Sequence, residues 1–230
     1  LEHGRLDDAL SRNAEAIRIG LTLKPVPADV AIWSANRVVY LYSAGRTEEA
    51  IATAQDGIAR ASAALGPEHP AMANLYANLG AILLRLNRPH DAMAPIRQAF
   101  ELIEKAAGAP NQNSATMRVQ FAQALVRAGR YADAIAFLDS ATPIIDAQLG
   151  AKSDRSLTAR DTRLIALIAL GQGAQAEALA RELLDIRDAR LPEGHRDRAN
   201  ARENLAKAAF SQGDWTTARS AAAQAVALRE

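Results

Sequence analysis

Apolar residues recur at intervals of three and four along most of this chain, the spacing of one face of an α-helix. The run Leu75, Leu79, Ile82, Leu83 and Leu86 is the clearest example. Short segments with Gly or Pro separate these stretches, and both residues are common at helix boundaries. The pattern predicts an all-α protein of about eleven helices.

The same landmarks return with a fixed period. A small turn residue is followed five residues later by Ala, and after the first step of 41 the turn residues are 42 residues apart. The pairs are Gly4/Ala9, Gly45/Ala50, Asn87/Ala92, Gly129/Ala134, Gly171/Ala176 and Gly213/Ala218. A second series, Gly66, Gly108 and Gly150, keeps the same step and is continued by Pro192. A period of this length predicts a solenoid in which each repeat is a hairpin of two antiparallel helices.

Each period holds an A helix before the small-residue turn and a B helix after it. The predicted A helices are 28–44, 70–86, 112–128, 154–170 and 196–212. The predicted B helices are 6–23, 47–65, 89–107, 131–149, 173–190 and 215–229. We therefore expect one array over 1–230, with a half repeat at 1–27 (helix B only) and repeats at 28–69, 70–111, 112–153, 154–195 and 196–230.

Composition narrows the partners that we expect. The chain is 49% hydrophobic but only 4% aromatic, so Ala, Leu, Ile and Val must form the core. With 27 basic and 26 acidic residues, it has no general attraction for nucleic acid or for an anionic membrane. The absence of cysteine excludes disulfides and thiolate metal sites and is typical of a cytoplasmic protein. The apolar run 164–170 is far shorter than the roughly 20 residues of a membrane span.

Motifs for catalysis are missing from the sequence. His69 and His195 lie three periods apart, so in a solenoid they cannot share a metal ion. No HExxH, paired-Cys or Gly-x-Ser-x-Gly motif and no phosphate-binding loop is present. We expect no enzyme activity, no cofactor and no metal.

Two segments carry a resemblance to a known family. Gly-Arg-Thr-Glu-Glu-Ala-Ile at 45–51 and Gly-Arg-Tyr-Ala-Asp-Ala-Ile at 129–135 resemble tetratricopeptide repeats. The 42-residue period and the linker Leu-Gly-Pro-Glu-His-Pro at 65–70 are similar to the longer subtype of kinesin light chains. Many bacterial proteins carry similar arrays, so a bacterial source is expected. The resemblance implies a right-handed superhelix whose concave groove, lined by A helices, binds extended or helical peptides.

One row of A-helix positions matches the groove residues of that family. Steps of 42 from Asn78 give Asn36, Asn78, Gln120, Thr162 and Asn204. In the family, an Asn matching Asn78 holds the partner's main chain, and a carboxamide suits this because it both donates and accepts hydrogen bonds. The alternative is that these residues form an ordinary solvated polar face.

Other A-helix residues set the charge of the predicted groove. Arg85 and Arg127 recur one period apart and suit a partner that carries a carboxylate or acidic side chains. Alternatively, both arginines cap the last carbonyl groups of their helices. Asp161 and Glu203 make the groove more acidic toward the C-terminal end. Further predicted binding residues are Asn74, Gln123, Asn200 and Lys207, and the aromatic residues Trp33, Tyr40, Tyr42 and Phe210 either anchor a partner or fill the core.

These observations predict a cytoplasmic scaffold that binds a polypeptide segment of another protein in the A-helix groove, as a monomer or weak homo-oligomer. Two alternatives remain open. The chain could be a regulatory or sensory segment of a larger protein, such as a bacterial kinase or transcription regulator, or it could be a self-assembly module.

Overall fold

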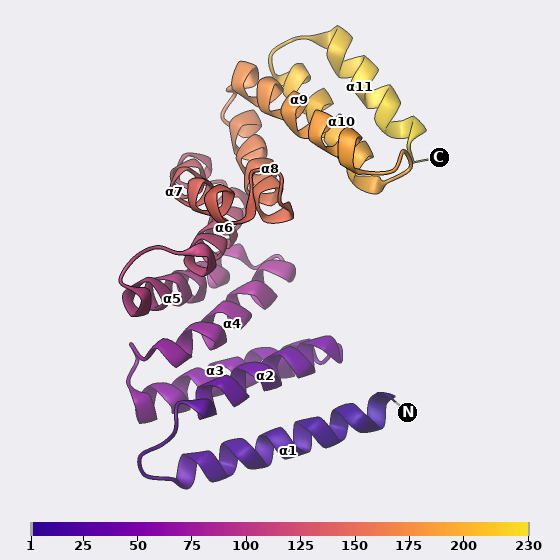
Figure 1. Cartoon of the computed structure of the whole chain (residues 1–230). Coiled ribbons are helices and arrows are strands. Elements are labelled where there is room, and N and C mark those ends of the chain that lie inside the picture. Colours follow the sequence, from indigo (N-terminus) through magenta and orange to yellow (C-terminus); the bar gives the residue numbers. More distant parts are fainter. Residues whose placement is uncertain (1, 230) are drawn as a thin grey trace. The chain divides into compact units, whose positions relative to one another are not determined.

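A computed structural model describes the backbone of residues 2–229 and the side chains of residues 6–229, so the side chain of His3 lies outside the described residues. This part of the chain contains eleven α-helices, one short 3-10 helix and no strand (Figure 1). The bounds are α1 (Glu2–Thr22), α2 (Asp29–Ser43), α3 (Thr47–Leu65), η1 (Pro70–Met72), α4 (Ala73–Arg85), α5 (Pro89–Ala107), α6 (Gln112–Arg127), α7 (Tyr131–Leu149), α8 (Asp154–Ala169), α9 (Gly173–Arg190), α10 (Arg196–Ser211) and α11 (Trp215–Ala227). The predicted all-α class and the number of helices are confirmed. The A helices are α2, α4, α6, α8 and α10, and the others are B helices.

The chain divides into two compact units, Leu1–Ala124 and Leu125–Glu230, and the division falls inside α6. In the first unit, α2 packs against α1, α3 and α4, and α4 packs against α5. In the second unit, each helix from α7 to α11 packs against the next, and α8 also contacts α10. Neighbouring A helices therefore lie side by side within each unit. The repeat boundaries and the single array stay predictions.

The turns between A and B helices require a left-handed backbone, and this explains the small residues at the repeated position. Gly45, Gly129, Gly171 and Gly213 have φ between +69° and +83°, and Asn87 has φ +55°. Asn is the best tolerated substitute for Gly in this region. The first copy differs, because Gly4 lies inside α1 and not at a turn.

Small side chains let the helices of one layer approach closely. The repeated alanines Ala50, Ala92, Ala134, Ala176 and Ala218 are all buried. Gly80 shows how tight the approach is, since a Cβ built on it would lie 2.4 Å from Ile96 Cγ1. The period is therefore maintained by packing as well as by turn geometry.

Aliphatic side chains fill both cores, and an aromatic contact adds to them in the first unit. The fully buried Leu41, Leu75 and Ile96 come from α2, α4 and α5. Phe100 and Phe121 meet edge to face with ring centroids 5.9 Å apart. In the second unit, Leu157, Leu164, Leu167, Leu183 and Leu205 join α8, α9 and α10 into one hydrophobic cluster. Each such side chain contributes about 1.5–3 kcal/mol to stability.

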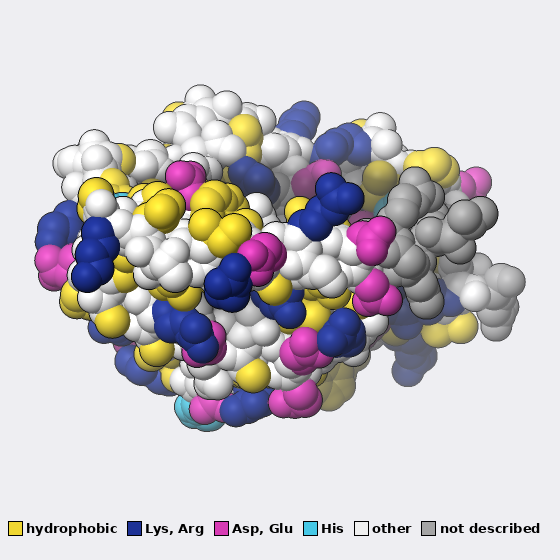
Figure 2. Space-filling model, turned by 90° about the horizontal axis from the view of Figure 1, so that it is seen from below, with side chains coloured by type: hydrophobic (Ala, Val, Ile, Leu, Met, Phe, Trp, Pro, Cys, Tyr) yellow, Lys and Arg dark blue, Asp and Glu magenta, His cyan; other side chains and the backbone are white. Residues whose placement is uncertain are grey.

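The surface carries mixed charge. On the face shown in Figure 2, basic and acidic side chains are interspersed among apolar and neutral ones. None of the helices in the described part of the chain is both long enough and apolar enough to cross a membrane. Among the same residues, no group of three or more His, Cys, Asp or Glu side chains is placed to hold a metal ion.

Candidate functional site

The predicted row of carboxamides is only partly open in the first unit. Asn36 on α2 and Asn74 on α4 are exposed. Asn78 is half-buried, and its Nδ2 donates to the backbone oxygen of Ala35 at 3.1 Å. Asn78 therefore ties α4 to α2, so its removal affects stability as well as any binding.

The next two members of the row are less accessible than predicted. Gln120 is half-buried, and its Oε1 atom has no hydrogen-bond partner among the described residues. The Thr162 side chain is only 4% exposed, and its hydroxyl donates to the backbone oxygen of Thr158 at 2.8 Å. A threonine hydroxyl in a helix commonly bonds the carbonyl one turn back, which turns it away from solvent. Thr162 is therefore not placed to hold a partner's main chain.

The predicted charged residues differ in their surroundings. Arg85 is exposed, packs over the Tyr42 ring with 5.7 Å from Cζ to the ring centroid, and has no carboxylate within ion-pair distance among the described residues. Arg127 is also exposed, and like Arg85 it is the last residue of its helix, so helix capping stays an alternative for both. Lys207 pairs with Glu203 of its own helix at 2.7 Å. Gln123 is half-buried.

The predicted aromatic anchors fall into two groups. Trp33 and Tyr42 are half-buried, which is typical of packing residues. Tyr40 is more exposed, and Phe210 is 62% exposed and meets Trp215 edge to face, with ring centroids 4.9 Å apart. Phe210 and Trp215 together form an aromatic pair on the surface of α10 and α11.

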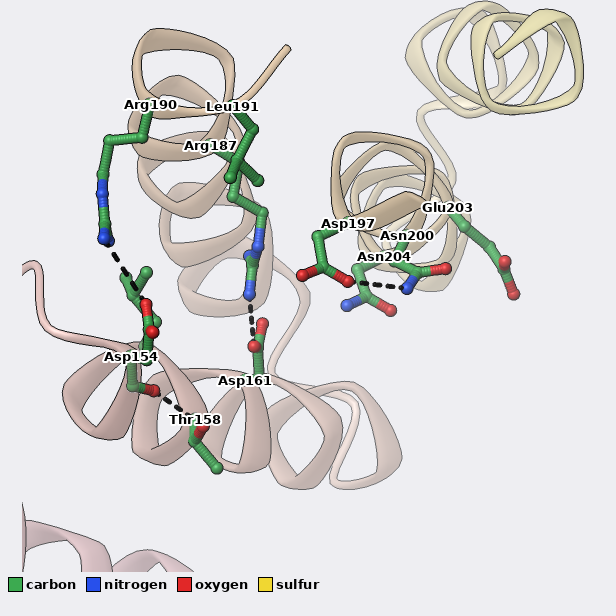
Figure 3. Close-up of a pocket in the computed structure, with 11 residues that line it drawn as sticks. Asp154, Thr158, Asp161, Arg187, Arg190, Leu191, Asp197, Asn200, Glu203 and Asn204 are labelled. Carbon is green, nitrogen blue, oxygen red and sulfur yellow. Dashed lines mark hydrogen bonds and ion pairs between the residues drawn. The ribbon is translucent and has the colours of Figure 1, made fainter. Parts of the chain in front are cut away.

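A polar site lies in the second unit, between α8, the end of α9 and α10 (Figure 3). We call it the α8–α10 hollow, and its volume is about 450 Å³. It is lined by Asp154, Leu157, Thr158, Asp161, Arg187, Arg190, Leu191, Asp197, Asn200, Glu203 and Asn204. Two of the predicted binding residues, Asn200 and Asn204, therefore share one cavity.

Two ion pairs join α9 to α8 across the hollow. Arg187, with a side chain only 11% exposed, pairs with Asp161, and Arg190 Nη2 lies 3.4 Å from Asp154 Oδ1. Burial raises the pKa of Asp161, against the lowering effect of Arg187, and the charge of Asp197 raises it further.

The α10 wall presents groups with unused hydrogen-bonding capacity. Asn204 is half-buried and makes no side-chain hydrogen bond with any described residue. Asn200 Nδ2 lies 3.4 Å from Asp197 Oδ1. His195 Nδ1 accepts a hydrogen bond from the Asp197 amide at 3.1 Å and lies 3.9 Å from the Asp197 carboxylate. Glu203 points away from the others in Figure 3 and pairs with Lys207 and Arg229.

Sequence reasoning missed four of the six charged residues of the hollow: Arg187, Arg190, Asp154 and Asp197. The predicted groove consists of A-helix positions near the row of carboxamides, whereas both arginines come from the last turn of a B helix. A signal was present for Arg187, because the residue one period earlier is Ile145, which is fully buried.

Two family models match the sequence. Both are described as tetratricopeptide repeat, and they match residues 29–105 and 198–230. No curated protein matches this chain in sequence.

Solved structures with similar folds include one that is named as a putative kinesin light chain. A putative kinesin light chain from Podosopora anserina is 19% identical, with a TM-score of 0.71 over 85% of this chain and 92% of that chain. BtubC (BKLC) from P. vanneervenii is 16% identical, with a TM-score of 0.73 over 97% of this chain and 91% of that chain.

A tetratricopeptide repeat protein from Parabacteroides merdae is similar over the whole of this chain and 75% of its own, with 16% identity and a TM-score of 0.66. At these identities, the likeness of all three structures is one of fold. The α-solenoid of helix hairpins predicted from the 42-residue period is thus found in solved structures as well.

Proposed function

The chain belongs to the tetratricopeptide-repeat family, and we propose that it is a protein-interaction scaffold that binds a polypeptide segment of another protein along its A helices. The proposal includes a cytoplasmic location, a monomer or weak homo-oligomer, and no catalysis or cofactor. Repeats of this family typically serve as non-catalytic scaffolds. The ion pairs around the α8–α10 hollow also occupy most of its carboxylates, which leaves little for acid–base chemistry.

One observation carries the proposal: A helices in both units present carboxamides with unused hydrogen-bonding groups. Asn36 and Asn74 are exposed, and Asn204 lines a hollow without a hydrogen-bond partner among the described residues. A carboxamide pairs with a peptide group through one donor and one acceptor, so these side chains suit a partner's backbone.

Arg85 supports a partner with an acidic side chain or carboxylate. Its guanidinium is exposed, stacked over Tyr42 and without a carboxylate in reach among the described residues. The planar guanidinium can grip a carboxylate through two parallel hydrogen bonds. Arg127 stands one period later and is part of the same proposal.

The test compares two triple variants of the full chain against a random peptide library displayed on phage. The first variant is Asn36→Ala/Asn74→Ala/Asn204→Ala. Its matched control removes three exposed carboxamides from B helices, as Gln55→Ala/Gln98→Ala/Gln148→Ala. Peptides selected on the natural chain should bind the first variant about tenfold more weakly, since each lost hydrogen bond costs about 1 kcal/mol or less at an exposed site. The control should bind them normally, and equal affinities for both variants would refute binding along the A helices.

Self-association is a second candidate, favoured by an apolar hollow of about 650 Å³ beside Phe210 and Trp215. Gly173 is the residue equivalent to Trp215 one period earlier. A Cβ added to Gly173 would lie 2.6 Å from Gln212 Cβ, so the next hairpin covers the position of Gly173. Trp215 itself is 61% exposed, and large aromatic residues are enriched in interfaces. If a second copy covers this surface, the molar mass of the natural chain in light scattering will rise with concentration. The Trp215→Ala variant will stay monomeric in the same measurement. A constant monomer mass for the natural chain excludes this candidate.

A further inference from the structure

We infer that the α8–α10 hollow receives the side-chain amide of a Gln or Asn residue of the bound polypeptide, an inference that rests on the function proposed above. Two atoms in the wall of the hollow carry it. Asp161 Oδ1 and Arg187 Nη1 are both buried, and neither has a hydrogen-bond partner among the described residues. A buried polar atom without a partner is costly, so a ligand group that supplies both missing partners is favoured there.

The two unpaired atoms belong to one ion pair. Arg187 donates from Nη2 to Asp161 Oδ2, so the pair makes only one of the two parallel hydrogen bonds that a guanidinium and a carboxylate can form. The remaining carboxylate oxygen can only accept, and the remaining guanidinium nitrogen can only donate. Both side chains line the hollow, so a small turn of either terminal group brings its unpaired atom to the surface. The matching ligand group must donate one hydrogen bond and accept another, as an amide does.

The charges of the hollow favour a neutral ligand group. Four carboxylates and two arginines line the hollow, and one of these carboxylates, Glu203, pairs with Lys207 and Arg229 outside the lining. Four negative charges therefore stand against four positive ones. A charged ligand group would enter this balanced set without a compensating partner, which is costly at a partly buried site. A neutral amide avoids this cost.

The remaining lining residues suit the rest of a Gln or Asn residue. In Figure 3 the Asn204 side chain extends from α10 toward the pair of Asp161 and Arg187, so its own donor and acceptor can bind the other side of an entering amide. Leu157 and Leu191 offer apolar contact for the methylene groups. A volume of about 450 Å³ admits a side chain, whose amide reaches deeper into the wall than a main-chain amide flanked by its own side chains.

The experiment begins with a random dodecapeptide phage library selected on the full chain. We expect Gln and Asn to be enriched over the unselected library. The most enriched Gln-containing peptide is then synthesised with a fluorescent label, both with Gln and with Met in its place, which keeps the approximate length but removes the donor and the acceptor. The natural chain should bind the Met peptide about tenfold more weakly, as expected for lost hydrogen bonds to charged groups.

The wall of the hollow is then tested with Arg187→Leu/Asp161→Leu, which removes both unpaired atoms. This variant should bind the Gln and the Met peptide with equal affinity. The matched control is Arg163→Leu/Asp139→Leu, which removes another Arg–Asp pair of α8, this one with α7 and outside the lining. The control should keep the tenfold preference for Gln, because the two sites are independent.

A conservative variant covers the case in which the double leucine variant does not fold, which circular dichroism checks. Arg187→Lys keeps the positive charge beside Asp161 but removes the second nitrogen of the planar guanidinium. It should reduce the preference for the Gln peptide from about tenfold to about threefold. An unchanged preference in a folded Arg187→Lys variant would count against a role for Arg187 Nη1.

The outcomes separate this inference from the proposed function. If Gln and Asn are not enriched, if the natural chain binds both peptides equally, or if the double leucine variant weakens both peptides to the same extent, the inference is wrong. The proposed function still stands in that case if the selected peptides lose affinity for the triple carboxamide variant. If the natural chain selects no peptide at all, the proposed function fails and the inference fails with it.

Discussion

Replacing Gly80 with Ala tests how closely the helices of one layer approach. Gly80 is a buried residue within α4, and its backbone is not left-handed, so Ala is compatible with its conformation. The added Cβ would lie 2.4 Å from Ile96 Cγ1 and 3.3 Å from both Cδ1 and the backbone nitrogen of Ile96. Non-bonded carbon atoms prefer a separation of about 3.5–4.0 Å, so α4 and α5 must move apart or Ile96 must leave its rotamer.

Two effects of opposite sign determine the magnitude. Ala is favoured over Gly inside a helix by about 1 kcal/mol. Overpacking a closely filled core costs about 1–3 kcal/mol and occasionally more. Ile96 is fully buried, and its backbone nitrogen limits movement of the side chain alone, so we take the upper end of this range. The net expectation is a loss of about 2 kcal/mol in the free energy of unfolding.

Urea titration followed by circular dichroism at 222 nm measures the effect, with Ala81→Gly as the control. Ala81 is the next residue of the same helix and is half-buried, so this change reports helix propensity and should cost about 0.5–1 kcal/mol. Because stacked repeats do not always unfold in one step, the comparison uses transition midpoints and slopes together.

A double-mutant cycle with Ile96→Ala identifies the contact. Ile96→Ala alone should cost about 2–5 kcal/mol because it leaves a cavity. In the Gly80→Ala background the cost should be smaller by about 1 kcal/mol or more, since the new methyl group occupies part of the space that Cγ1 vacates. If Gly80→Ala is as stable as the natural chain, or if the two changes are additive, the close approach of α4 and α5 is not what requires glycine.

Two further predictions concern ion pairs. Arg118 donates two hydrogen bonds of 2.8 Å to Glu104, and these bonds hold the pKa of Glu104 below 4.5. The stabilisation from this pair is therefore complete above about pH 4.5 and is lost as the pH falls through the folded-state pKa of Glu104. Glu104→Gln should lower the free energy of unfolding by about 1 kcal/mol at pH 7, and the difference from the natural chain should disappear in acid. Urea midpoints measured across this pH range test both expectations. Arg187→Leu leaves Asp161 without its ion-pair partner and should lower the free energy of unfolding by about 3 kcal/mol. The double variant Arg187→Leu/Asp161→Leu should lie within about 1 kcal/mol of the natural chain in thermal unfolding. A double variant as unstable as the single one would contradict this expectation.

The features that could be predicted from the sequence are those set by local geometry and repeated in every layer. A left-handed turn tolerates Gly or Asn, and so the turn positions from Gly45 to Gly213 were evident from residue type alone. The alanines five residues later are buried because the B helix packs closely there. Both constraints recur once per period, which made them visible in a single sequence.

The state of each candidate binding residue depends on contacts between helices, which the spacing of 42 does not specify. Asn78 and Asn36 occupy equivalent positions, yet Asn78 donates across to α2 and Asn36 is exposed. Thr162 occupies the same position in α8, but its short side chain bonds its own helix. Equivalent positions therefore need not have equivalent roles, because the neighbouring layer differs in each case.

The charged pairs of the second unit show which signal in the sequence does report such contacts. Asp161 stands where the three preceding periods have Ala35, Ala77 and Val119, and Arg187 stands where they have Ala61, Ile103 and Ile145. The next period again carries charge at both positions, as Glu203 and Arg229, and these two also pair, at 2.5 Å. A charge placed at an otherwise apolar position is costly unless its partner is supplied, so both positions change together.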